Sequence, residues 1–361
     1  MTKNICILAG ARPNFVKVSP LVRAISQRPE ARCLLVYAGS ADDPTLEASL
    51  FDDLQIDRPQ YYLGVVSTSL NEITSQVMAQ FDKFLDEHPV DVVIVVDDLA
   101  STMAAAIVTK KRGIRLAHLV AGTRSFDIKM PKEINRLVID ALSDYLFTAG
   151  VRSTGVATRE QSEQSQTYMV GNILMDTLRF NHDRLIRPSL LPDLQENSYL
   201  VFTLNRKALI ADEDNLRKML TALVEAANGT PIIAPLRDDA AKTVLAVANS
   251  SLFTLHSSLT TTSPLSYLEF GWLTARAKGV ITDSGNVAEE ATFNGVPCIT
   301  LNNYTEHQET VTVGSNVLVG EDPEKLRETV TQLVSGQWKH SALPDRWDGR
   351  TADRILQILL A

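Results

Sequence analysis

The sequence contains little cysteine, and its histidines show no metal-binding pattern. Only three cysteines occur among 361 residues, and Cys6, Cys33 and Cys298 each lie in an apolar, strand-like run. Such thiols are typically free and buried in a reducing compartment, which argues against disulfides. The six histidines lack metal-ligand spacing. We therefore expect a cytoplasmic protein without a metal or cofactor. Four histidines in polar context are expected at the surface: His88, His182, His256 and His340.

Long basic runs and long apolar runs are also missing. The formal net charge is −8, and no basic stretch offsets it, which argues against a nucleic-acid partner. No apolar run approaches the length of a membrane span, and the N-terminus enters a strand pattern directly, so we expect neither a membrane segment nor a signal peptide. The composition is that of an ordinary globular protein, 45% hydrophobic and 22% charged, and the length favours two domains.

Short apolar strands alternate with helical patterns through the first half of the chain. Strands are predicted at residues 4–9, 33–37, 90–96, 114–120, 145–148 and 167–170, and helices at 13–25, 46–54, 70–88 and 103–111. This alternation is typical of right-handed crossovers in a parallel sheet, whose strands end at one shared edge. Polar residues that follow the strands should therefore collect at that edge: Arg12, Lys17, Asp98, Arg124 and Arg136.

A polar stretch at residues 177–198 interrupts the alternation and is interpreted as a linker. Beyond it, strands are predicted at 199–203, 231–234, 280–282 and 296–301, and helices at 212–227, 265–273, 287–294, 323–335 and 352–361. We expect α/β architecture with two doubly wound, Rossmann-like halves and a cleft between them.

The strand–helix–strand unit from Val280 to Leu301 is a candidate ligand site. Residues 283–286 form a turn rich in capping residues, and Gly295 is placed to end the helix that follows. Free N–H groups and the dipole at a helix start favour phosphate. Glu289 and Glu290 lie where they could reach ribose hydroxyls. An ordinary capped helix on a parallel sheet is the alternative interpretation.

Several motifs resemble those of the non-hydrolysing UDP-N-acetylglucosamine 2-epimerases. Residues 10–17 are similar to their opening motif, and residues 121–136 to A-G-L-R-S-F-x-x-x-M-P-E-E-x-N-R. Residues 283–290 resemble D-S-G-G-x-x-E-E, and residues 305–309 resemble T-E-R-P-E. The resemblance implies a homodimer of the two-domain GT-B fold. It places one Rossmann-like domain at 1–178, a second at 179–346, and a last helix at 347–361 that packs back on the first.

The resemblance implies C2 epimerisation of a UDP-linked N-acetylhexosamine through loss and re-addition of UDP. The nucleotide half of the motif set is retained, although Asn286 stands in place of a glycine and His307 in place of an arginine. The positions that it assigns to binding of UDP or the sugar are Arg12, Lys17, Arg124, Asn205, Arg206, Ser284, Gly285, Asn286, Glu290 and His307.

The proton-transfer half departs from the family pattern at three positions. Val120 replaces the catalytic glutamate of H-V-E-A-G, Lys132 replaces the first glutamate of M-P-E-E, and Asn205 replaces the histidine of G-H-R. The candidate catalytic residues that remain are Asp98, Glu133, Arg136 and His118. Asp97 replaces a glycine, where it either raises the pKa of Asp98 by repulsion or caps the next helix.

These substitutions leave three hypotheses. The first is an epimerase with a rearranged site, in which Asp98 and either Glu133 or His118 transfer the protons. The second is a different reaction on a UDP-sugar, such as glycosyl transfer or hydrolysis, with Lys132 binding an acidic sugar or acceptor. The third is a non-catalytic UDP-sugar-binding protein. Residues 39–41 replace a G-Q-H motif that helps to bind an activating second UDP-N-acetylglucosamine in some members, so we expect no such activation.

Overall fold

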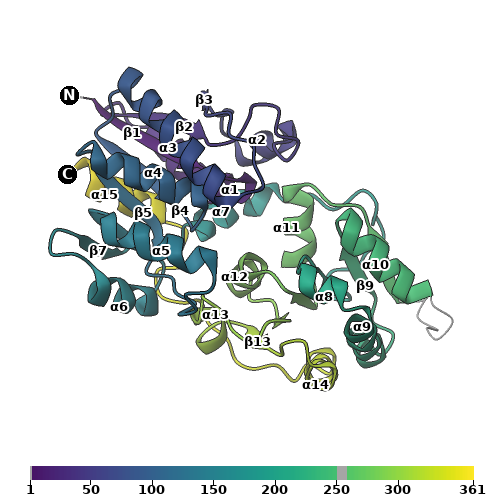
Figure 1. Ribbon diagram of the computed structural model, residues 1–361. Helices are drawn as coiled ribbons and strands as arrows, with labels where there is room; N and C mark the ends of the chain where they lie inside the picture. The colour runs from purple at the N-terminus through teal and green to yellow at the C-terminus, as the bar shows by residue number, and fades with distance from the viewer. Residues whose placement is uncertain (1, 250–257) are drawn as a thin grey trace. The chain divides into compact units, whose positions relative to one another are not determined.

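The strands of the described chain pair in parallel throughout and form two separate sheets (Figure 1). The computed structural model describes residues 2–249 and 258–361. It divides into one unit of Met1–Asn181 with Asp345–Ala361 and a second unit of His182–Pro344. The predicted α/β fold class with two parallel-sheet, Rossmann-like domains is therefore confirmed.

The first unit is built on a sheet whose described strands follow the order β3-β2-β1-β4-β5-β6-β7. The strands are β1 (Lys3–Ala9), β2 (Ala31–Tyr37), β3 (Tyr61–Tyr62), β4 (Val92–Val96), β5 (Arg115–Ala121), β6 (Tyr145–Thr148) and β7 (Gln166–Met169). The helices are α1 (Arg12–Ser26), α2 (Ala48–Leu54), α3 (Leu70–Glu87), α4 (Ala100–Lys111), α5 (Pro131–Leu142), α6 (Val151–Glu160), α7 (Ile173–Asn181) and α15 (Thr351–Leu360). Helices α3, α4 and α5 share one core with the sheet, whereas α1, α7 and α15 pack against one another.

Strand register explains why polar residues meet at one edge of this sheet. Leu8 pairs with Val95, and Val96 pairs with Leu119. Because the three strands run parallel and end level, the residues after β1, β4 and β5 are neighbours. The sequence pattern predicted this edge correctly.

The second unit is built on a sheet whose described strands follow the order β10-β9-β8-β11-β12-β13. The strands are β8 (Leu200–Phe202), β9 (Ile232–Pro235), β10 (Leu259–Thr262), β11 (Gly279–Thr282), β12 (Cys298–Thr300) and β13 (Asn316–Leu318). The helices are α8 (Lys207–Ala211), α9 (Glu213–Ala227), α10 (Asp238–Asn249), α11 (Tyr267–Ala275), α12 (Gly285–Phe293), α13 (Glu309–Thr312) and α14 (Pro323–Val334), with a 3-10 turn, η1, at His182–Arg184. One core contains residues of α9, α10 and α14, and another contains residues of α11 and α12.

The predicted linker is wrong at its start. Thr177 and Asn181 belong to α7 and are buried, and the Thr177 hydroxyl donates a hydrogen bond to the Val16 carbonyl oxygen. Tertiary packing against α1 therefore overrides the polar composition of this stretch. Helix α6 was not predicted, because Gly155 and a run of polar residues obscure its apolar face.

The C-terminal segment is fixed to the first unit. The Asp176 carboxylate accepts hydrogen bonds from the backbone N–H groups of Thr351, at 3.0 Å, and Ala352, at 2.7 Å, at the start of α15. The indole N–H of the buried Trp347 donates to the Ala149 carbonyl oxygen at 3.1 Å. Figure 1 shows α15, in yellow, beside the N-terminal strands of this unit.

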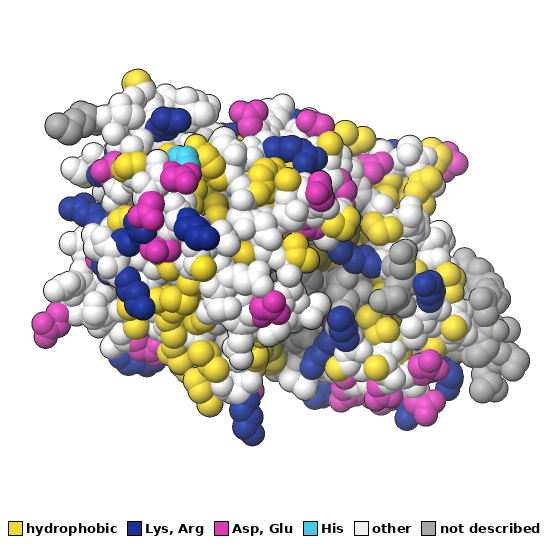
Figure 2. Space-filling model, turned by 45° about the horizontal axis from the view of Figure 1, so that its top comes forward, with side chains coloured by type: hydrophobic (Ala, Val, Ile, Leu, Met, Phe, Trp, Pro, Cys, Tyr) yellow, Lys and Arg dark blue, Asp and Glu magenta, His cyan; other side chains and the backbone are white. Residues whose placement is uncertain are grey.

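Charges of both signs are interspersed over the face of the molecule shown in Figure 2. Among the described residues, no helix is both long and apolar enough to cross a bilayer. The three cysteines are free; Cys6 and Cys298 are buried and Cys33 is half-buried. His182 and His340 are exposed, but His88 is half-buried against the rings of Tyr61 and Phe84; His256 lies outside the described residues.

Candidate functional site

One face of helix α5 carries the polar centre of the first unit. Glu133, Arg136 and Asp140 are spaced three and four residues apart, which places them on one side of a helix. All three are buried. Pro131 occupies the first turn, where its missing N–H leaves no intrahelical hydrogen bond unmade. The helix therefore presents two carboxylates and a guanidinium to the strand ends.

Asp98 is held by this helix. The guanidinium of Arg136 donates to its Oδ2 through Nε at 2.8 Å and also through Nη2, and the side-chain amide of Asn135 donates to its backbone oxygen at 2.8 Å. The Nζ of Lys132 lies 3.6 Å from Asp98 Oδ1, which is an ion pair but too long for a hydrogen bond. Asp98 is thus a fixed, charge-balanced group.

Glu133 is the acceptor that shapes the loop before α5. Its carboxylate accepts from the backbone N–H and the hydroxyl of Ser125, from the N–H of Phe126 and from Arg136. Burial on its own would raise the pKa of Glu133, but these donors hold it below its usual value. The carboxylate therefore stays ionised and is occupied by hydrogen bonds.

His118, Arg124 and Asp140 form a second buried group. Asp140 lies 2.5 Å from His118 Nδ1 and 2.7 Å from Arg124 Nη1, and it accepts the N–H of Gly122 at 3.1 Å. Burial on its own would raise the pKa of Asp140, but His118 and Arg124 lower it. The Nε2 of His118 lies 2.9 Å from the Asp97 carbonyl oxygen, so each ring nitrogen of His118 faces an oxygen atom.

The interpretation of Asp97 as the cap of the next helix is wrong. Leu99 is the N-cap residue of α4, and the carboxylate of Asp97 instead pairs with Lys17 Nζ at 2.6 Å and accepts from Asn14 at 2.9 Å. Burial would raise the pKa of Asp97, but the charge and hydrogen bond of Lys17 lower it. Asp97 adopts a φ of 58°, the left-handed backbone that the family's glycine would favour.

Val120 lies at a bulge in β5. Its φ is 72°, and the register between β5 and β6 shifts between Leu119 and Ala121. A β-branched residue in the left-handed region is unusual and costs roughly 1–3 kcal/mol. The backbone at this position is therefore bulged and strained, and the side chain can transfer no proton.

Arg12, at the start of α1, pairs with a different acidic residue. Its Nε donates to Glu47 Oε2 at 3.2 Å, and its side chain is partly exposed. Its neighbour Asn14 accepts the N–H groups of Gly10 and Ala11, which fixes the turn between β1 and α1.

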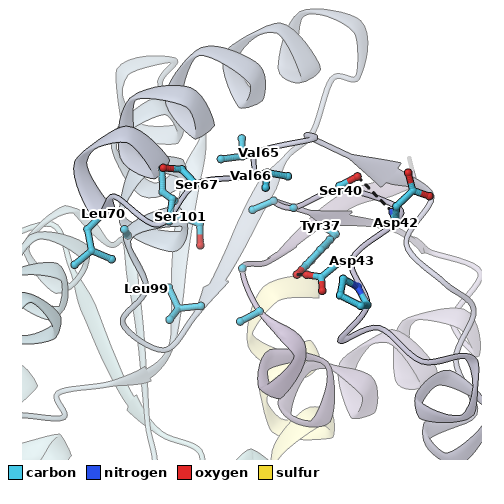
Figure 3. Close-up of a pocket in the computed structure, with 17 residues that line it drawn as sticks. Tyr37, Ser40, Asp42, Asp43, Val65, Val66, Ser67, Leu70, Leu99 and Ser101 are labelled. Atoms are coloured by element: carbon cyan, nitrogen blue, oxygen red, sulfur yellow. Dashed lines mark hydrogen bonds between the residues drawn. The ribbon is translucent and has the colours of Figure 1, made fainter. Parts of the chain in front are cut away.

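A cavity of about 520 Å³ opens among the loops that follow β1, β2 and β4 in the first unit (Figure 3). Its walls are mainly apolar and include Val65, Leu70 and Leu99, while Asp42 and Asp43 lie on one side. The Tyr37 hydroxyl donates to Asp43 at 2.5 Å. None of the described residues that line it is Lys, Arg or His, so this cavity offers phosphate no cation.

Helix α12 of the second unit begins at Gly285, two residues before the predicted start at residue 287. The Ser284 hydroxyl caps it by accepting the N–H of Val287, and Gly295 ends it with a φ of 69°. A side chain at Gly285 would meet no heavy atom within 4 Å, so the helix start is open. Asn286, predicted as part of the turn at residues 283–286, is a regular first-turn residue of the helix.

The loop before this helix is braced by Asp283. Its Oδ2 accepts the backbone N–H groups of Asn205, at 2.7 Å, and Arg206, at 2.5 Å. The Arg206 guanidinium pairs with Glu321 at 3.0 Å. The two sequence-predicted residues of the β8–α8 loop therefore lie beside the β11–α12 turn.

The acidic pair of α12 is buried rather than extended toward solvent. His307 Nδ1 lies 3.1 Å from Glu289 Oε1, and Glu289 is 1% exposed. Burial, with the nearby charge of Glu289, raises the pKa of Glu290 to about 8. Glu290 is therefore mostly protonated at neutral pH and can both donate and accept hydrogen bonds.

Glu290 makes stability depend on pH. A carboxyl whose pKa is about 8 when folded and 4.5 when unfolded stabilises the fold fully below pH 4.5, and this contribution is lost as pH rises to 8. Relative to Glu290→Gln, the wild type should lose up to about 1.4 kcal/mol of unfolding free energy per pH unit in this range. Urea unfolding at several pH values measures the difference; parallel curves for the two proteins would contradict the burial of an ionisable group here.

Several partners of the predicted residues were missed from the sequence. Asn14 binds Asp97, Asp140 and Glu160 both pair with Arg124, and Ser125 binds Glu133. The spacing of Glu133, Arg136 and Asp140 was the available signal, had α5 been predicted. The described residues contain no group of three or more side chains positioned to hold a metal ion.

Two sheets with these strand orders, each followed at its carboxyl edge by fixed polar loops, define a two-domain Rossmann-like protein of the GT-B class. A family model described as UDP-N-acetylglucosamine 2-epimerase matches residues 23–360, and the chain belongs to this family.

Relatives of known sequence and structure agree with this assignment. The chain is 33% identical to a UDP-N-acetylglucosamine 2-epimerase homolog of Methanococcus maripaludis, covering 91% of this chain and 92% of the relative. It is 31% identical to UDP-2,3-diacetamido-2,3-dideoxy-D-glucuronate 2-epimerase of Pseudomonas aeruginosa, covering 88% of each. The crystal structure of Methanocaldococcus jannaschii UDP-GlcNAc 2-epimerase in complex with UDP-GlcNAc and UDP is similar with a TM-score of 0.85 and 29% identity, covering 99% of both chains.

Proposed function

We propose that this protein binds a UDP-linked N-acetylhexosamine, holds UDP at the start of α12, and catalyses standard C2 epimerisation slowly or not at all. The observation that carries the first part is the open, Ser284-capped helix start at Gly285. Free backbone N–H groups and the positive end of the helix dipole are well suited to a pyrophosphate. The similar M. jannaschii protein crystallised with UDP-GlcNAc and UDP supports the choice of ligand.

The hydrogen bonds of the remaining acid/base candidates support the proposal that standard C2 epimerisation is slow or absent. Removal of the C2 proton needs a group of suitable pKa within reach of the sugar. Asp98 is engaged by Arg136, Glu133 by loop donors, and His118 by acceptors on both nitrogens. Val120 supplies no proton acceptor. We infer that Asp98 and Arg136 hold and orient the sugar, and that Glu133 and His118 maintain the surrounding structure.

The M. jannaschii and P. aeruginosa relatives are both named as 2-epimerases, so a rearranged epimerase remains the alternative with the strongest precedent. The other two alternatives are a different reaction on a UDP-sugar and a non-catalytic binding role. We also propose that the protein is a cytoplasmic homodimer that binds no second nucleotide in the first-unit cavity. Light scattering should give the mass of a dimer, and titration with UDP should give a one-site binding isotherm.

Replacing Gly285 with leucine should lower UDP affinity by about tenfold or more, because the new side chain would stand where the phosphates approach the helix. It should change the unfolding free energy by less than about 0.5 kcal/mol, because the added Cβ meets no heavy atom within 4 Å. Isothermal titration with UDP measures the affinity.

Gly155→Leu is the matched control, because Gly155 is also helical and also has no heavy atom within 4 Å of its added Cβ. It should bind UDP as the wild type does. Wild-type affinity in a folded Gly285→Leu protein would place the nucleotide elsewhere.

A further inference from the structure

The position of Lys132 in its helix is electrostatically unfavourable for a cation. It is the second residue of α5, within the first turn, where the helix dipole disfavours a cation. The pairing with Asp98 at 3.6 Å does not include a hydrogen bond. The donors of its ammonium group are therefore available to another acceptor.

Among the paired cations at this sheet edge, Lys132 is also the most accessible. Its side chain is 59% exposed, compared with 7% for Lys17, 2% for Arg124 and 4% for Arg136. Those three cations pair with Asp97, with Asp140 and Glu160, and with Asp98 and Glu133. A ligand at Asp98 would thus meet Lys132 as its exposed positive charge.

The charge of this region is also two units more positive than that of the family motif, although Asp97 in place of a glycine lowers it by one unit. Valine for glutamate at position 120 raises the formal charge by one unit, and lysine for glutamate at position 132 raises it by two. Asp98, Glu133, Arg136 and Lys132 together carry no net charge, whereas a glutamate at 132 would leave them at minus two. The arrangement with glutamate at position 132 would repel a carboxylate on the ligand, whereas the arrangement with Lys132 would tolerate it.

We propose that Lys132 selects a UDP-sugar whose hexose carries a carboxylate, by pairing with that carboxylate beside Asp98. The inference rests on the proposed function, since it requires the sugar of a bound UDP-sugar to lie at Asp98. Lys132 acts as a specificity residue, and the ammonium-to-carboxylate pair that forms is a charge-assisted hydrogen bond.

Titration of UDP, UDP-N-acetylglucosamine and its derivative oxidised to a carboxylate at C6 tests the proposal. The wild type should bind the carboxylate derivative about tenfold or more tightly than the parent sugar. Lys132→Met should abolish that ratio, and Lys132→Glu should invert it. Lys129→Met is the matched control, an exposed lysine three residues earlier, and it should keep the wild-type ratio.

The outcomes distinguish the role of Lys132 from the binding of UDP. Equal affinity of the wild type for both sugars, or a preference that survives in Lys132→Met, overturns the role of Lys132 while leaving UDP binding intact. Absence of UDP binding to the wild type overturns the proposed function and this inference together.

Discussion

A variant carrying Val120→Glu, Lys132→Glu and Asn205→His is expected to exchange the C2 proton of UDP-N-acetylglucosamine at least about 10²-fold faster than the wild type. A positioned proton-transfer group typically contributes about 10²–10⁴-fold, and such contributions are not additive when the groups act together. Restoring all three groups in one protein is therefore more informative than any single replacement. Incorporation of solvent deuterium measures the rate.

The structure favours this gain because the backbone at position 120 is still bulged, with a φ of 72°. Glutamate is not β-branched, so it should relieve strain at this position rather than add it. The matched control carries Val120→Gln, Lys132→Gln and Asn205→His, which keeps the size of the side chains and removes the titratable carboxylates. A folded glutamate variant no faster than this control would show that other differences in the site limit the reaction.

Asp140→Ala is expected to lower the free energy of unfolding of the first unit by about 3–5 kcal/mol, because it leaves His118 and Arg124 buried without their shared carboxylate. It also leaves the N–H of Gly122 without its acceptor. Fluorescence of Trp347 during urea unfolding reports the first unit when Trp272 and Trp338 are replaced by phenylalanine.

Asp214→Ala in a protein that retains Trp272 provides the comparison, because Asp214 pairs with Arg217 at 2.9 Å while remaining 85% exposed. Its loss should cost less than about 0.5 kcal/mol in the second unit, monitored there by Trp272 in a protein that retains it. A cost below about 1 kcal/mol for Asp140→Ala would mean that the buried pairs do not hold the strand ends together.

The sequence predicted where functional residues lie better than it predicted their partners. Strand periodicity locates the ends of β1, β4 and β5, and parallel pairing then requires Asp98 and the residues around it to be neighbours. Asp140 was missed because α5 was not predicted, so its place on the helix face with Arg136 went unseen. The pairing of Asp97 with Lys17 depends on tertiary geometry, which no local pattern encodes.

In the second unit too, the sequence predicted local features better than tertiary contacts. Capping chemistry located the start of α12 within two residues, at the turn of residues 283–286 that contains its cap Ser284, and its end at Gly295, since both are local backbone effects. The burial of Glu289 and Glu290 depends on the elements that cover α12, and the pairing of Glu289 with His307 joins residues of separate elements. Neither could be derived from the spacing of charges along the helix.

Proton NMR of UDP-N-acetylglucosamine with the wild-type protein in deuterated water tests the central claim most directly. We expect saturation transfer to the uridine signals, which reports binding, with the C2 proton retained over hours. Anomeric cleavage without C2 exchange would identify a different reaction on the bound sugar and remain consistent with that claim. Rapid entry of deuterium at C2, together with signals of the manno epimer, would contradict it.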